Sequence, residues 1–150
     1  MMLRRAPLAL GAVLIGLSCA SDGSGKEAIG VMVRDPWIRT PPPFANTAAL
    51  YTLIENVSSA PDSLIAIESP SCESFALHRT VTESGVASMT AIDEGGLPVG
   101  SGETLVLEPL GLHGMCLGLS DSLTDGDQVE VELVFASAGR VALIVPVERR

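Results

Sequence analysis

Basic side chains, aromatic rings and histidines are all scarce in this chain of 150 residues. Nine Lys and Arg stand against 18 Asp and Glu, and the formal charge of −9 argues against binding to nucleic acid or to anionic lipid through a basic patch. The two histidines belong to no recognisable Ser-His-Asp or Cys-His arrangement, so the protein is not expected to be an enzyme. No long segment repeats its apolar residues with a period of 3.6, which argues against a helical fold.

Residues 1–18 have the features of a secretory signal peptide. Arg4 and Arg5 precede an apolar run over residues 6–17, which is too short to span a bilayer. Cleavage before Cys19 would make this cysteine a lipidated N-terminus, whereas ordinary cleavage would follow Ala20; the first alternative is favoured. Both place the protein outside the cytoplasm, in the periplasm or cell envelope, with a lipid anchor as its only expected link to the membrane. Residues 19–27 are then a flexible tether, and residues 28–150 form one domain.

The domain is predicted to consist of short strands separated by turns rich in Gly, Pro and Asp. Apolar and polar residues alternate over residues 129–135, and a β-branched run follows over 140–147. Further strands are expected over residues 30–34, 48–55, 63–68, 74–80, 87–92, 103–107 and 113–119. A spacing near ten residues predicts an all-β, antiparallel sandwich or barrel of about eight or nine strands.

One histidine lies in the tripeptide His113-Gly114-Met115. Residues two apart on a strand point to the same face, so the imidazole and the thioether should lie on one side, with Gly114 giving room between them. Cys116 should then point to the opposite face.

The other histidine, His78, is separated by ten residues from Met89. The intervening segment contains a turn at Gly85, and a hairpin of this length could return Met89 to the neighbourhood of His78. Two imidazoles and two neutral thioethers would form a soft ligand set that suits Cu(I) better than zinc or hard cations. Because thioethers carry no proton, metal capture would depend on pH only through the histidines.

Two cysteines lie within the expected domain, Cys72 and Cys116. In an exported protein they could form a disulfide, or they could remain buried thiols if their Cα atoms lie too far apart. The sequence leaves both alternatives open.

The order of these residues resembles the signature of the PCuAC family of periplasmic copper chaperones: His, ten residues, Met, a spacer, and then His-X-Met. The spacer between Met89 and His113 has 23 residues, slightly more than is usual in that family. Much of the surrounding sequence is also similar to the family, in the segments Asp35–Arg39, Asn46–Tyr51, Leu77–Thr80, Leu107–Met115 and Gly126–Phe135.

The resemblance implies a cupredoxin-like or immunoglobulin-like β-sandwich with Greek-key topology. It implies that His78, Met89, His113 and Met115 bind Cu(I). It further implies delivery of this copper to the copper A centre in the copper-bearing subunit of cytochrome c oxidase, often alongside a thioredoxin-like assembly factor.

Two other functions stay open at this point. A blue-copper electron-transfer site could use His78, His113, Cys116 and a methionine, although such sites usually place the cysteine before the histidine and methionine of one loop. A metal-free adhesion or assembly module of immunoglobulin-like shape would need none of these ligands.

Overall fold

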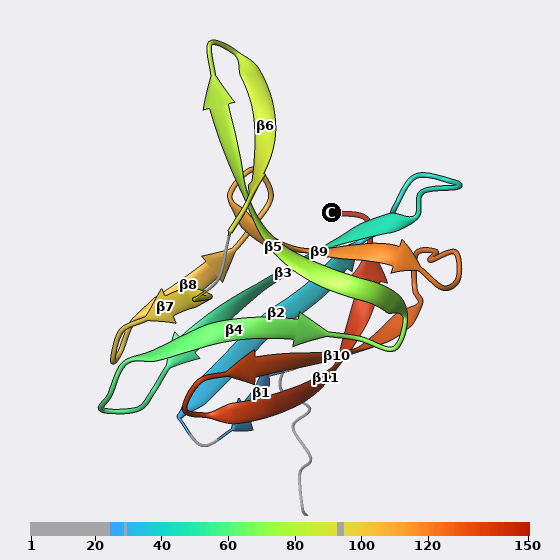
Figure 1. Ribbon diagram of the computed structural model, residues 1–150. Coiled ribbons are helices and arrows are strands. Elements are labelled where there is room, and N and C mark those ends of the chain that lie inside the picture. The colour runs from blue at the N-terminus through green and yellow to red at the C-terminus, as the bar shows by residue number, and fades with distance from the viewer. Residues whose placement is uncertain (1–24, 29, 93–94) are drawn as a thin grey trace, which may run out of the picture.

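The computed structural model describes residues 25–28, 30–92 and 95–150, which form eleven strands and no helix (Figure 1). Over these residues, no helix is therefore available that could cross a membrane. The strands are β1 (Gly25–Ala28), β2 (Val31–Arg39), β3 (Thr47–Asn56), β4 (Asp62–Glu68), β5 (Cys72–Glu83), β6 (Val86–Ala91), β7 (Leu97–Val99), β8 (Thr104–Leu107), β9 (Leu112–Leu119), β10 (Gln128–Phe135) and β11 (Gly139–Glu148).

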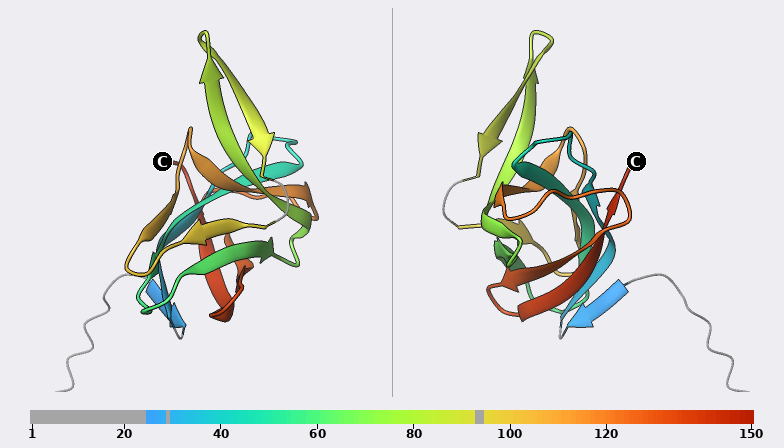
Figure 2. Two further views of the ribbon diagram at one scale, coloured as in Figure 1. Left: turned by 60° about the vertical axis from the view of Figure 1, so that its left-hand side comes forward. Right: turned by 90° about the vertical axis from the view of Figure 1, so that its right-hand side faces the viewer.

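The strands are arranged in two layers that face each other (Figures 1 and 2). One layer has the order β6-β5-β9-β3-β2, with β8 beside β3 and β1 beside β2; the other has the order β11-β10-β4-β7. The layers join where β11 runs parallel to β2, with Val147 opposite Ile38. Every other pair of neighbouring strands is antiparallel. The expected all-β sandwich is confirmed.

The core lies between the two layers and follows the alternation of the strands. On β10, the residues Val129, Val131, Leu133 and Phe135 are buried while Gln128 and the residues between them are more exposed. Fully buried side chains such as Ile54 and Leu64 face them from other strands. Burying each aliphatic side chain of this size stabilises the fold by roughly 1.5 to 3 kcal/mol.

Two of the eleven strands were not expected. Strand β7 has only three residues and contains Pro98, so its sequence gave no alternation to recognise. Strand β1 lies at the end of the segment expected as a tether, where Gly25–Glu27 pair with β2. This pairing satisfies backbone groups of the first half of β2, whose second half pairs with β11. The signal peptide, Cys19 and the first part of the tether lie outside the described residues.

The hairpin of β5 and β6 projects from one end of the sandwich (Figures 1 and 2). Its turn is formed by Ser84 and Gly85, whose φ angles of 52° and 80° are typical of a two-residue hairpin turn. The position of this hairpin determines where Met89 lies.

Candidate metal centre

His78 and His113 lie directly opposite each other on the antiparallel strands β5 and β9. The centroids of their rings are 5.8 Å apart, and the rings meet edge to face. Because metal–nitrogen bonds are about 2 Å long, rotation of the side chains would suffice for both imidazoles to bind one ion. The long-range register of two strands thus brings together the only two histidines of the chain.

Met115 is two residues beyond His113 on β9 and shares its face of the sheet. Its neighbours across the sheet are small, Ala49 on β3 and Ala76 on β5, and Met115 itself is partly exposed. Gly114 faces the other way, into the core, where a Cβ would lie 2.8 Å from Cδ1 of Ile67. The glycine therefore makes room for the side chain of Ile67 in the opposite layer, and the expectation that it gives room between the imidazole and the thioether was wrong.

Met89 pairs with Thr80 in the hairpin, and His78 pairs with Ala91. Opposite residues of an antiparallel pair share a face, so Met89 lies on the same face as His78, diagonally one step farther out. Such diagonal neighbours are roughly 7 to 8 Å apart in a regular ladder. The side chain of Met89 is 61% exposed, whereas that of His113 is only 4% exposed. All four predicted ligands thus share one face of the sheet. Met89 lies on the projecting hairpin, and the other three ligands lie below it on β5 and β9.

Each histidine has at least one ring nitrogen that is not used in a hydrogen bond. Nδ1 of His113 lies 3.1 Å from the carbonyl oxygen of Gly111, which can only accept, so this nitrogen carries the proton and Nε2 is free to bind a metal. Nδ1 of His78 is buried and has no hydrogen-bond partner. A buried polar atom without a partner is costly, and a metal ion would satisfy it.

Burial, followed by repulsion from His113, lowers the pKa of His78. The imidazole is therefore kept neutral, which is the state that binds metal. Within the described residues no group of three or more His, Cys, Asp or Glu side chains could hold an ion. A metal at this position would need the thioethers in addition to the two imidazoles.

An aromatic row, which the sequence analysis did not associate with the site, extends from His113 across the same face. Tyr51 lies 6.2 Å from His113 between ring centroids, and Trp37 lies 4.6 Å from Tyr51. The guanidinium of Arg39 lies over both aromatic rings, at 5.6 Å from Tyr51 and 5.9 Å from Trp37. Burial raises the pKa of Tyr51, and this row helps to shield His113 from water. The only signal in the sequence was that Trp37 and Tyr51 lie in segments that resemble the PCuAC family.

Cys72 and Cys116 form a disulfide on the opposite face of the same two strands, with Cα atoms 5.6 Å apart. Cys116 is buried in the core, as its alternation with Met115 predicted. The blue-copper alternative required a free Cys116 thiolate and is contradicted by this bond.

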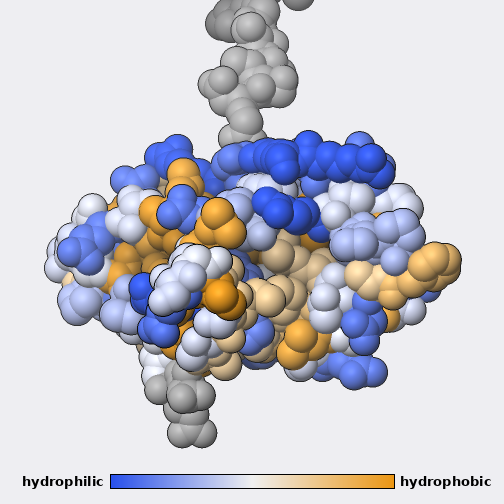
Figure 3. All heavy atoms as spheres, turned by 90° about the horizontal axis from the view of Figure 1, so that it is seen from above, coloured by the Kyte–Doolittle hydropathy of each residue, from blue (hydrophilic) through white to orange (hydrophobic). Residues whose placement is uncertain are grey.

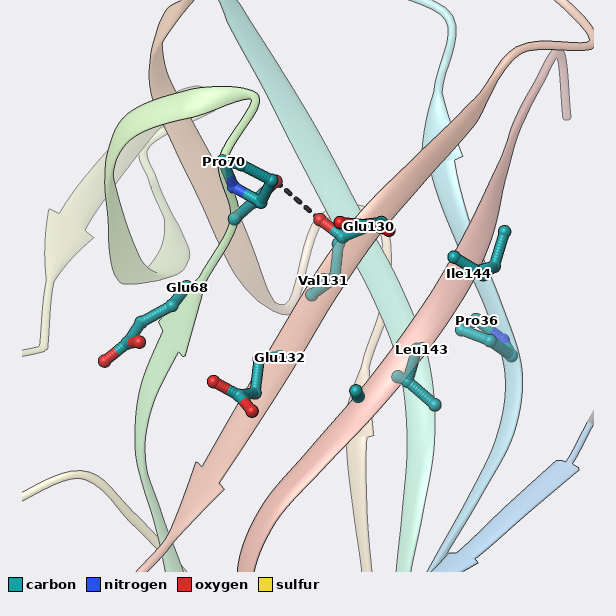
Figure 4. Close-up of a pocket in the computed structure, with 10 residues that line it drawn as sticks. Pro36, Glu68, Pro70, Glu130, Val131, Glu132, Leu143 and Ile144 are labelled. Carbon is teal, nitrogen blue, oxygen red and sulfur yellow. Dashed lines mark hydrogen bonds between the residues drawn. The ribbon is translucent and has the colours of Figure 1, made fainter.

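A hollow of about 800 Å³, lined mainly by residues of the layer that contains β4, β10 and β11, has no such combination of histidines and methionines. Its rim has the exposed carboxylates Glu68 and Glu132, both paired with Arg140, and its floor is formed by apolar residues such as Leu143 (Figure 4). The Ser69 hydroxyl closes one side by donating to the carbonyl oxygen of Glu130 at 2.6 Å. Its lining includes no histidine, methionine or cysteine.

Solved structures of copper-binding domains have the same fold. The copper-bound PCuAC domain from PmoF2 matches with a TM-score of 0.67 and 26% identity, covering 85% of this chain and all of that domain. The solution structure of Cu(I)-DR1885 from Deinococcus radiodurans matches with a TM-score of 0.62 and 25% identity, covering 77% of this chain and 76% of that one. These matches confirm the resemblance to PCuAC domains.

Two sequence comparisons agree with each other. A protein described as "Putative lipoprotein Lxx21020" from Leifsonia xyli subsp. xyli (strain CTCB07) is 31% identical over 144 residues, which covers 91% of this chain and 85% of the relative. The family model described as "Putative lipoprotein LpqE-like" matches residues 31–147, which is nearly the whole domain. The chain therefore belongs to the LpqE-like family, with the fold of PCuAC domains.

Proposed function

We propose that this protein is an extracytoplasmic Cu(I) carrier whose site is formed by His78, Met89, His113 and Met115. The observation that carries the proposal is their placement on one face, combined with a buried Nδ1 on His78 that has no partner. Two nitrogens and two neutral sulfurs suit a soft monovalent ion, and the copper-bound relatives with this fold support the choice of metal. Copper is the cargo of the protein, and no chemical step on another substrate is proposed.

The route of the copper is part of the same proposal. The protein would be exported, anchored by a lipid on Cys19, and would deliver Cu(I) to the copper A centre of cytochrome c oxidase, directly or through a thioredoxin-like assembly factor. The lipoprotein descriptions of the family and of the relative from Leifsonia xyli support the anchor. The exposure of Met89 supports a transfer function, because a ligand at the surface can be exchanged for one from a recipient.

An anaerobic Cu(I) titration against a colorimetric chelator, with native mass spectrometry for stoichiometry, tests the proposal. We expect one tightly bound Cu(I) in the wild type and its loss in the double variant His113→Ala Met115→Leu, with circular dichroism to check that the fold is kept. Met32→Leu is the matched control, because Met32 is the one methionine of the domain outside the proposed site. A wild type that does not compete with the chelator would show that the domain is a metal-free module.

A further inference from the structure

The most exposed large apolar side chains of the described residues all lie in two loops and one hairpin. Phe44 is 102% exposed, Leu110 82%, Val86 69% and Met89 61%. They belong to the loop of residues 40–46, the loop of residues 108–111 and the β5–β6 hairpin. Figures 1 and 2 show these three connections at the same end of the sandwich, the end at which the hairpin projects. Apolar side chains concentrated in this way indicate a binding surface.

Two of these residues also have an unfavourable backbone. Phe44 and Leu110 have φ angles of 66° and 64°, in the left-handed region that bulky side chains rarely adopt. Their side chains extend into solvent, so burial within this chain does not compensate the strain. Strained residues that hold a side chain in an exposed position are typical of functional sites.

An open face of the sheet lies between these connections. It presents Met115 and Leu117 from β9, flanked by Ala49 from β3 and Ala76 from β5. All four residues are partly exposed to solvent. Figure 3 looks onto this end, where hydrophobic residues in orange and tan occupy much of the middle, interspersed with hydrophilic residues in blue that also form a band along one edge. We call this area, together with Phe44, Leu110 and Met89, the docking face.

The docking face contains two of the four proposed copper ligands, Met89 and Met115, and lies next to a third, His113. The carbonyl oxygen of Gly111, next to Leu110, accepts a hydrogen bond from the backbone N–H of Thr80 at 3.1 Å and also lies 3.1 Å from Nδ1 of His113. Thr80 in turn pairs with Met89. A protein that binds the docking face would therefore contact Leu110 and Met89 at the same time.

The position of strand β1, where the domain begins, favours a protein over a membrane as the partner that binds the docking face. Strand β1 lies at the far end of the sandwich from the hairpin in Figures 1 and 2. The proposed lipid anchor at Cys19 precedes Gly25 by six residues, which span at most about 20 Å when fully extended. A membrane held by this anchor would lie near β1, and the docking face would point away from it.

We propose that the docking face binds the copper-receiving protein, and that the matching surface of this partner is apolar and surrounds thiolate or thioether ligands. The inference rests on the proposed copper-carrier function. Cu(I) would pass without change of oxidation state, as each Cu–S or Cu–N bond broken on this chain is replaced by one to the recipient. The exchange begins at Met89, the most exposed of the four ligands.

Anaerobic stopped-flow transfer of Cu(I) to the apo form of the soluble copper A domain of the oxidase subunit tests this docking. The test variant is Phe44→Asn Leu110→Asn, since Asn tolerates a left-handed backbone and neither residue is a proposed ligand. The control is Ile65→Thr Ile144→Thr, two exposed apolar residues on β4 and β11 of the other layer. We expect the test variant to raise the half-saturating recipient concentration at least about tenfold with unchanged Cu(I) affinity, and the control to stay within about twofold.

Other outcomes would overturn the proposal. Cu(I)-loaded wild type that transfers nothing to the copper A domain, or a test variant that transfers as well as wild type, would exclude this occupant. Self-association of the wild type in analytical ultracentrifugation that is lost in the test variant would assign the face to a second copy. Binding of the unlipidated chain to phosphatidylglycerol vesicles that is lost in the variant would assign it to a membrane. A wild type that binds no Cu(I) would instead refute the proposed function itself.

Discussion

Removal of the Cys72–Cys116 disulfide is expected to lower stability substantially. The two cysteines are 44 residues apart in sequence, and the bond closes a loop of that length. Loop-closure entropy for about 45 residues corresponds to about 4 kcal/mol at 25 °C. For a domain of this size, that loss corresponds to a fall in Tm of about 12 to 16 °C.

Urea unfolding of the double variant Cys72→Ala Cys116→Ala, compared with the wild type, measures this loss. The m-value should rise because the unfolded chain is no longer cross-linked and exposes more surface. The copper site should change much less, since its residues lie on the opposite face and the β5–β9 pairing remains. We therefore expect less than a tenfold change in Cu(I) affinity.

A loss of free energy of unfolding below about 1 kcal/mol would refute the loop-closure argument. It would mean that the unfolded chain is already restricted by residual structure to a similar extent. A loss of Cu(I) binding in a variant that is still folded would show that the disulfide, and not the strand pairing, holds His78 opposite His113.

Three further results are expected. Gly114→Ala should lower the free energy of unfolding by about 1 to 3 kcal/mol, because the new Cβ crowds Cδ1 of Ile67. Adding Ile67→Val should recover part of this loss in a double-mutant cycle, and losses that simply add would contradict the packing argument. Burial alone would raise the pKa of Asp62, but backbone N–H groups of Ser137 and Ala138 donate to its carboxylate at 2.8 Å and lower this pKa. Asp62→Asn should therefore lower the free energy of unfolding by about 2 kcal/mol at pH 7. This contribution is present above the unfolded pKa of about 3.9 and is lost as pH falls through the lower folded value, so urea unfolding at about pH 3 should show a smaller difference between variant and wild type. Because the pKa of His78 is lowered, this imidazole should become protonated in the metal-free protein only at a pH below its ordinary value of 6.5; an NMR pH titration in which its ring protons shift with a midpoint at or above pH 6.5 would contradict this.

The sequence was sufficient to predict most of the strands, because alternation of apolar and polar residues is a local signal. It was insufficient for β1 and β7, which are short and lack that alternation. It also misjudged Gly114, whose neighbour Ile67 comes from the opposite layer and cannot be inferred from residues next to it in the chain.

The candidate site was predicted to a similar extent. The spacing of His113 and Met115 was enough to place them on one face, since side-chain alternation on a strand is a property of the backbone. The pairing of His78 with His113 depends on the register between β5 and β9, and no spacing along the chain specifies that register. The aromatic row of Trp37 and Tyr51 beside His113 depends on three strands that meet only in the folded sheet.

The residues themselves predict a soft ligand set and an exported chain from donor chemistry and composition, and they predicted the β-sandwich from alternation. Long-range packing specifies the rest: which nitrogen of His113 is free, that Cys116 is bonded to Cys72, and that Met89 lies exposed while His113 is buried. Each of these depends on contacts between segments far apart in sequence. Such contacts form only when the hydrophobic core brings the two layers and their strand registers together.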